Sequence, residues 1–263
     1  MVEQLPGGMA NAGRVLRDGE VVLRPAPANV ETLHCLLDHL ALRGFPSPRP
    51  LGCREDGVEV LGFIAGETSV FPHPDEWVRS DETLVAIGRL LRSLHDATRG
   101  FVPPEDAVWS SELADPKGGS VICHNDVCIE NIVISEGDAL ALLDFDFSAP
   151  GRPTWDLAMT ARYWVPLLDP TSARRTGRQN LDPVARLGLL VDAYDADVRT
   201  RREFTSVLME IEEVALRFLT ERVKRGDPAF VDMWEDSGGQ EAYGRRMSWL
   251  KELQTSIDSA LTA

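Results

Sequence analysis

The chain has 263 residues, of which 43% are hydrophobic and 26% are charged. These values are ordinary for a globular protein, so they exclude a disordered or collagen-like chain, and the length fits one domain or two closely packed lobes. Its 27 Lys and Arg residues against 42 Asp and Glu residues give a formal net charge of −15. This balance argues against a nucleic-acid partner, because such proteins neutralise phosphates with basic residues, and it permits a cationic small partner.

The sequence contains no pattern for a membrane segment, a secretory leader or a disulfide framework. No run approaches the roughly 18 apolar residues that a membrane helix needs, and residues 1–13 lack the features of a signal peptide. We therefore expect no membrane partner and a cytoplasmic location. The four cysteines are expected to be free thiols, and Cys123 and Cys128 lack the second Cys/His pair that structural zinc would require.

The N-terminal part alternates short β-prone runs with one helical pattern. Asp18-Gly19 between two such runs is a strong hairpin signal. The helical pattern begins after Asn29 and stops before Gly44, residues that are typical of helix ends. The expected elements are strands over 14–17, 20–24 and 58–64, a helix over 30–43 and extended chain over 46–50.

The remainder is mostly helical, with one small hairpin. A helix is expected to begin after Ser80, with Leu84, Ile87, Leu91 and Leu94 on one face. The other expected elements are a hairpin of 132–134 with 139–143, a helix ending at 222–225 and a final helix through 243–257. The order predicts an α+β fold with an N-lobe over 1–65, a mainly helical C-lobe over 66–263 and a ligand cleft between them.

Polar residues at fixed spacing follow the first of these C-lobe helices. His124, Asp126 and Asn131 fit the protein-kinase pattern H-x-D-x-x-x-x-N, and Asp144 begins a D-F-x motif after the hairpin. The hairpin would return Asp144 to the side of Asn131. Amide and carboxylate oxygens are suitable Mg²⁺ ligands, and Asp126 could accept the proton of an attacking hydroxyl. The pattern therefore predicts phosphoryl transfer.

Four motifs occur together: SLHDAT at 93–98, HNDVCIEN at 124–131, LLDFDF at 142–147 and WDLA at 155–158. With them the sequence resembles the aminoglycoside phosphotransferase and choline kinase-like family, whose fold is that of the protein kinases. The resemblance implies ATP or GTP with Mg²⁺ as cofactors. It also implies roles for six residues: Asp126 as catalytic base, Asn131 and Asp144 as metal ligands, Asp146 as a second-metal or water-mediated ligand, and His124 and Asp156 as supports of the catalytic loop.

The N-lobe departs from the kinase pattern at its phosphate-binding cation. The strand that should carry a lysine carries Arg24, and no lysine precedes Lys117. We expect the planar guanidinium of Arg24 to bind phosphate in its place. The position expected to hold the orienting glutamate holds His34, so Glu31, one turn earlier, is the candidate partner of Arg24.

Two further segments are candidates for nucleotide binding. The loop over residues 5–13, with Gly8 and Gly13, could cover the phosphates with its backbone N–H groups. The connection that includes Phe63 and Ile64 is expected to meet the base through its backbone. Both assignments follow from the resemblance to kinases.

The expected function is transfer of the γ-phosphate to a hydroxyl of a small molecule, such as an aminoglycoside or another antibiotic, or a metabolite. The acceptor is expected between the catalytic loop and the helices over 185–263, where Asp192, Asp195 and Glu235 could bind an amine. The alternative is an inactive nucleotide sensor, because the phosphate-binding lysine is missing. A protein kinase is disfavoured, since no A-P-E motif follows Asp144. The sequence indicates no oligomeric state.

Overall fold

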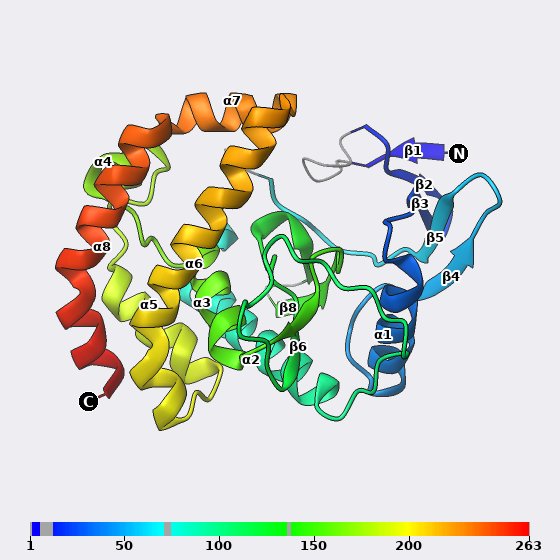
Figure 1. Cartoon of the computed structure of the whole chain (residues 1–263), viewed down its shortest axis with the longest axis horizontal. Coiled ribbons are helices and arrows are strands. Elements are labelled where there is room, and N and C mark those ends of the chain that lie inside the picture. Colours follow the sequence, from blue (N-terminus) through cyan, green and yellow to red (C-terminus); the bar gives the residue numbers. More distant parts are fainter. Residues whose placement is uncertain (1, 6–12, 71–74, 136–137, 263) are drawn as a thin grey trace.

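The computed structural model describes residues 2–5, 13–70, 75–135 and 138–262, and it separates a strand-rich part from a helical part (Figure 1). The strands are β1 (Val2–Gln4), β2 (Leu16–Asp18), β3 (Val21–Pro25), β4 (Pro50–Cys53), β5 (Val58–Gly62), β6 (Val121–Cys123), β7 (Ile132–Ser135), β8 (Asp138–Leu142) and β9 (Ala149–Gly151). The helices are α1 (Val30–Leu42), α2 (Asp81–Thr98), α3 (Pro153–Trp164), α4 (Pro170–Arg175), α5 (Pro183–Ala193), α6 (Val198–Arg225), α7 (Pro228–Ser237) and α8 (Gly239–Thr262), with 3₁₀ helices η1 (Glu76–Arg79) and η2 (Ile129–Asn131). Within these described residues, none of the helices is both long and apolar enough to cross a membrane.

The N-terminal sheet is antiparallel and has the order β1-β2-β3-β5-β4. The expected β2–β3 hairpin forms with its turn one residue later than predicted, because Asp18 ends β2 and Gly19 begins the turn with φ +62°. A left-handed φ favours glycine, which has no Cβ. Strand β4 was not predicted, since the extended chain expected over 46–50 overlaps it only at Pro50. Its place at the sheet edge tolerates Pro50, which has no N–H to donate.

Helix α2 lies in the middle of the molecule and connects the two parts (Figure 1). Its predicted apolar stripe is confirmed, since Leu84, Ile87, Leu91 and Leu94 are at most 1% exposed. The helix contacts α1 of the strand-rich part, the short strands β6 and β8, and α5 of the helical part. Strands β6 and β9 form one two-stranded ribbon and β7 and β8 another. These ribbons carry the loops 124–131 and 143–148.

We predict that Gly119→Ala destabilises the protein, because its backbone lies against β9 with no room for a side chain. A Cβ at Gly119 would lie 1.9 Å from the carbonyl oxygen of Gly151. The expected loss in free energy of unfolding is roughly 1–3 kcal/mol or more, measured by urea denaturation. Gly188→Ala is the control, since its Cβ would meet nothing within 4 Å; in a helix interior it should stabilise by about 0.5–1 kcal/mol. Equal effects of the two variants would contradict this packing.

Candidate functional site

The loop that follows β6 is held by a buried carboxylate in the first turn of α3. Asp156 accepts hydrogen bonds from the backbone N–H groups of His124 (2.7 Å) and Asn125 (2.8 Å). Asn125 itself has a left-handed φ of +65°, so these bonds stabilise a conformation that few residues adopt. Burial alone would raise the pKa of Asp156, but the hydrogen bond and charge of His95, with the loop amide, hold it below the usual range.

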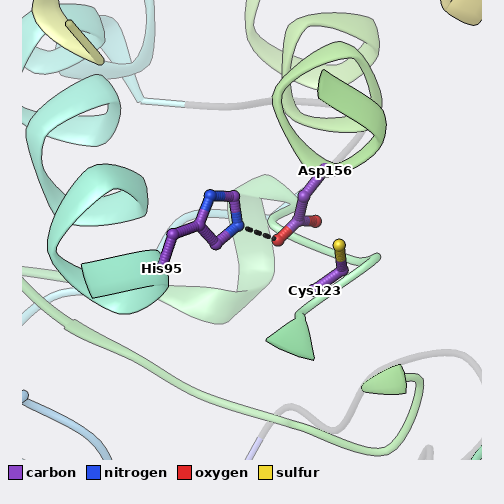
Figure 2. Close-up of side chains that lie close together, drawn as sticks. All are labelled: His95, Cys123 and Asp156. Carbon is purple, nitrogen blue, oxygen red and sulfur yellow. Dashed lines mark hydrogen bonds and ion pairs between the residues drawn. The ribbon is translucent and has the colours of Figure 1, made fainter. Parts of the chain in front are cut away.

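Behind Asp156 lie His95 and Cys123, and Figure 2 shows the three side chains pointing toward one another. His95 donates from Nε2 to Asp156 Oδ2 at 2.9 Å, and its Nδ1 is hydrogen-bonded to the Tyr194 hydroxyl at 2.7 Å. Burial raises the pKa of Cys123 well above its ordinary value, and its thiol donates to the Arg152 carbonyl. Although the three could ligate a metal by type, their hydrogen bonds are already used to support the loop.

Asp126 occupies the centre of the loop. Its carboxylate accepts hydrogen bonds from the Tyr163 hydroxyl at 2.7 Å and from Asn131 Nδ2 at 3.1 Å. Burial raises the pKa of Asp126 to about 7 in spite of the Tyr163 bond, and the charge of Asp144 adds to the rise. A carboxylate with such a pKa can gain and lose a proton near neutral pH, as general acid–base chemistry requires.

Two hydrogen bonds to the backbone of Leu143 join the loop to the end of β8. Leu143 N–H donates to Asn131 O at 2.8 Å, and His124 Nε2 donates to Leu143 O at 2.9 Å. His124 Nδ1 in turn accepts from the backbone N–H of Asp126 at 3.2 Å. Burial lowers the pKa of His124, which favours this neutral form. The structure thus brings Asp126, Asn131 and Asp144 to one site.

The side chains of Asn131, Asp144 and Asp146 offer the oxygen atoms that a divalent metal prefers. Asn131 uses its Nδ2 to donate to the carbonyl oxygen of Asp126 at 2.9 Å, which leaves its Oδ1 as the ligand atom. Asp144 has a left-handed φ of +56°. Burial and the charge of Asp144 raise the pKa of Asp146 to about 7, although Arg24 acts in the other direction. Like-charged carboxylates of this kind are what a Mg²⁺ ion would neutralise.

Arg24 connects the N-terminal sheet with these acids. From β3 it donates to Glu59 Oε2 at 2.6 Å, to Asp144 Oδ1 at 2.9 Å and to Asp146 Oδ1 at 2.7 Å. We call these four side chains the Arg24 clamp. Arg24 is only 8% exposed. Burial alone would lower the pKa of Arg24, but the three carboxylates raise it above its ordinary value.

The acidic partner of Arg24 is Glu59, so the prediction of Glu31 is wrong. Glu31 is exposed on α1, whereas Glu59 lies directly opposite Arg24 in the register of β3 and β5. The helix instead presents His34, whose Nε2 lies 2.9 Å from Glu59 Oε1. Glu59 is fully buried. The sequence signal that could have identified it is a single acid within the apolar run VEVLG.

The structure describes three of the four remaining residues that were expected to bind the nucleotide. Gly8 lies outside the described residues, and Gly13 is exposed with φ +75°. The backbone N–H of Phe63 donates to Glu20 O at 2.9 Å, so a base would have to bind other backbone groups of this connection. The Arg17 guanidinium lies 3.6 Å from the centroid of the Phe63 ring. Ile64 is half-buried beside it in the chain.

The three acids expected to bind an amine do not form one site, so that prediction is wrong. Asp192 pairs with Arg201 at 2.7 Å, and it lies with Asp195 just before α6. Glu235 is on α7, beyond the other end of α6 (Figure 1). Because α6 has 28 residues, its ends are about 42 Å apart at 1.5 Å per residue.

Tyr163 is a site residue that sequence reasoning missed. It follows Asp156 by seven residues in α3, two helical turns, so both side chains lie on the face toward the loop. That spacing is the signal that could have identified it.

We predict that Arg24→Met destabilises the protein, because Glu59, Asp144 and Asp146 lose their shared cation. The expected loss is about 2–4 kcal/mol in free energy of unfolding, less than for a fully buried pair since two of the acids remain partly exposed. Mg²⁺ should then raise the melting temperature of the variant more than that of the wild type.

Arg54→Met is the control for this experiment, because Arg54 is an exposed arginine of the same sheet region. The Arg24 clamp would not be a stabilising unit if the two variants were equally stable.

Comparisons with known proteins bear on the family and the fold of this chain. The sequence model of a family described as "Phosphotransferase enzyme family" matches residues 105–190. A trifolitoxin immunity protein from Rhizobium leguminosarum bv. trifolii is 31% identical over 259 residues, covering 94% of each chain. A choline/ethanolamine kinase family protein from Mesorhizobium loti has a similar structure, with a TM-score of 0.64 at 18% identity over 100% of this chain and 92% of that one. The macrolide 2'-phosphotransferase MphH from Brachybacterium faecium has a TM-score of 0.58 at 14% identity over 88% and 90%. These likenesses confirm the predicted α+β, protein kinase-like fold.

Proposed function

We propose that this chain transfers the γ-phosphate of ATP to a hydroxyl of a small molecule. The premise is that the chain belongs to the aminoglycoside phosphotransferase and choline kinase-like family. The observation that carries this proposal is Asp126. Its carboxylate has a pKa of about 7 and lies in one site with Asn131 and Asp144. A base beside two oxygen ligands for a metal is the arrangement that phosphoryl transfer to an alcohol requires.

In the proposed reaction the acceptor hydroxyl gives its proton to Asp126 while its oxygen forms a bond to the γ-phosphorus. The bond from that phosphorus to the β–γ bridging oxygen breaks, and ADP leaves. Tyr163 and Asn131 hold the Asp126 carboxylate in place through their hydrogen bonds. His124 and Asp156 keep the loop backbone fixed, so they position the base without touching the reactants.

The residues of this chain that would hold Mg²⁺ are Asn131 and Asp144, with Asp146 as a second or water-mediated ligand. A bound Mg²⁺ would neutralise charge on the phosphates as the bond breaks. Arg24 would bind phosphate oxygens through its planar fork, which suits them in shape and charge. Phe63, Ile64 and the loop with Gly8 and Gly13 complete the proposed nucleotide site.

For the acceptor, we propose a bioactive compound that phosphorylation would inactivate. The support is the name of the relative from R. leguminosarum, which is an immunity protein against a toxin. An antibiotic or another small toxin with a free hydroxyl fits this class.

The test is Asp126→Asn, measured as ADP release over a panel of hydroxyl-bearing antibiotics and metabolites. Turnover should fall by roughly 10²- to 10⁴-fold, because an amide cannot accept the proton. Binding of ATP and Mg²⁺, followed as a shift in melting temperature, should remain. Glu252→Gln, an exposed acid of α8, is the control and should turn over like the wild type. Full activity of Asp126→Asn would show that another group is the base.

A second candidate function is a nucleotide sensor that binds ATP without transferring phosphate. It is favoured by Arg24, which stands where a lysine is expected and pairs with both Asp144 and Asp146. Binding of ATP and Mg²⁺ by the wild type, with no ADP release over the whole panel, would support the sensor.

A further inference from the structure

Four arginines gather inside the helical part near the end of α3, and we call them the arginine cluster. They are Arg79 at the end of η1, Arg178 after α4, Arg186 on α5 and Arg246 on α8. Arg178 is 9% exposed and Arg186 is 4% exposed. Helices α4, α5 and α8 lie on the same side of the molecule (Figure 1). The cluster thus combines two buried arginines with the half-buried Arg79 and Arg246, whose charges act on Arg178 from segments far apart in the chain.

The nearby acids neutralise only part of this charge. Arg186 pairs with Asp81, and Arg246 pairs with Glu212 at 2.6 Å. In the parts of the chain that the structure describes, neither Arg79 nor Arg178 has a carboxylate partner. Two charges of the cluster therefore remain without a counter-ion.

Several guanidinium nitrogens of the cluster also lack a hydrogen-bond acceptor. Among the described residues, Nε of Arg79 and both Nε and Nη2 of Arg186 are buried without a partner. Arg178 donates from Nη1 to the carbonyl oxygen of Tyr163 at 3.0 Å. A guanidinium nitrogen of Arg79 lies against Gly177, 3.5 Å from where a Cβ would be. Arg186 Nη1 donates to the carbonyl oxygen of Arg79 at 2.9 Å, so the unused donors of Arg79 and Arg186 lie close together and next to the segment of Arg178.

Physical chemistry disfavours this arrangement unless an anion joins it. Burial, together with the charges of Arg186, Arg79 and Arg246, lowers the pKa of Arg178 to about 10, a rare direction for an arginine. A buried cation without a partner is strongly destabilising, because it has lost its hydration. The planar guanidinium fork matches the oxygens of phosphate and carboxylate groups and can donate two bonds to them.

We propose that the arginine cluster is a binding site for an oxyanion, a phosphate or carboxylate group of a small molecule, with Arg178 and Arg79 as its main donors. The site adjoins the proposed catalytic centre through a single residue. Arg178 binds the carbonyl oxygen of Tyr163, and the hydroxyl of Tyr163 binds Asp126. The identity of the oxyanion rests on the proposed function: it is a group of the acceptor. The acceptor then carries a negative charge at one end rather than a positive one.

The test uses inorganic phosphate as the probe, without nucleotide or Mg²⁺, and follows melting temperature and isothermal titration calorimetry. Phosphate should stabilise the wild type, and Arg178→Gln should weaken phosphate binding at least tenfold. In phosphate-free, low-salt buffer Arg178→Gln should melt at or above the wild-type temperature, because the substitution removes repulsion. A merely structural arginine would instead lower the melting temperature and leave phosphate binding unchanged.

Two matched variants locate the site. Arg174→Gln, an exposed arginine of α4, and Arg24→Gln, at the nucleotide site, should both keep the phosphate response. Arg79→Gln should weaken phosphate binding as Arg178→Gln does. It replaces Arg178→Gln in the test if that variant fails to fold. The proposal is overturned if phosphate does not stabilise the wild type. It is also overturned if Arg24→Gln is the only variant that abolishes the phosphate response, or if Arg174→Gln weakens that response as much as Arg178→Gln does. Because phosphate binding needs no turnover, its result is separate from that of the Asp126→Asn assay.

Discussion

The central physical interaction of this protein is the Arg24 clamp. One guanidinium from the N-terminal sheet is shared by a glutamate of the neighbouring strand and by two aspartates from the segment after β8. The clamp therefore joins the two parts of the molecule at the place where nucleotide and metal are proposed to bind. Without a cation at this point the three acids would repel one another, so either Arg24 or a metal must be present.

Two aspartates of the site show how the surroundings assign different tasks to the same side chain. Asp156 receives two backbone N–H groups and a histidine, which stabilise its charge and lower its pKa. Asp126 is half-buried as a residue, and the desolvation of its carboxylate, with the charge of Asp144, raises its pKa to about 7. The first can thus anchor a loop as a permanent anion, whereas the second can exchange a proton. This difference follows from the hydrogen bonds that Asp156 receives from His95 and the loop amide, and from the desolvation that raises the pKa of Asp126.

Local patterns were sufficient to predict much of the fold and the centre of the candidate site. The apolar stripe of α2, the β7–β8 hairpin and the spacing of His124, Asp126, Asn131 and Asp144 are all encoded over short distances in the chain. The partner of Arg24 is not, because it depends on the register between β3 and β5, which are joined through a helix and an edge strand. Glu31 was chosen because it lies on the helix that follows Arg24 in the sequence, yet the acid that Arg24 contacts is Glu59. Likewise, Asp192 and Asp195 lie before α6 and Glu235 lies after it, so the length of this helix keeps them apart.

The most direct test of the account is a crystal structure of the protein with ATP and Mg²⁺. The account predicts that Mg²⁺ binds Asn131 and Asp144, that Arg24 leaves at least one aspartate, and that its guanidinium donates to phosphate oxygens. A complex in which Arg24 keeps its bonds to Asp144 and Asp146, with the nucleotide and metal bound elsewhere, would contradict it.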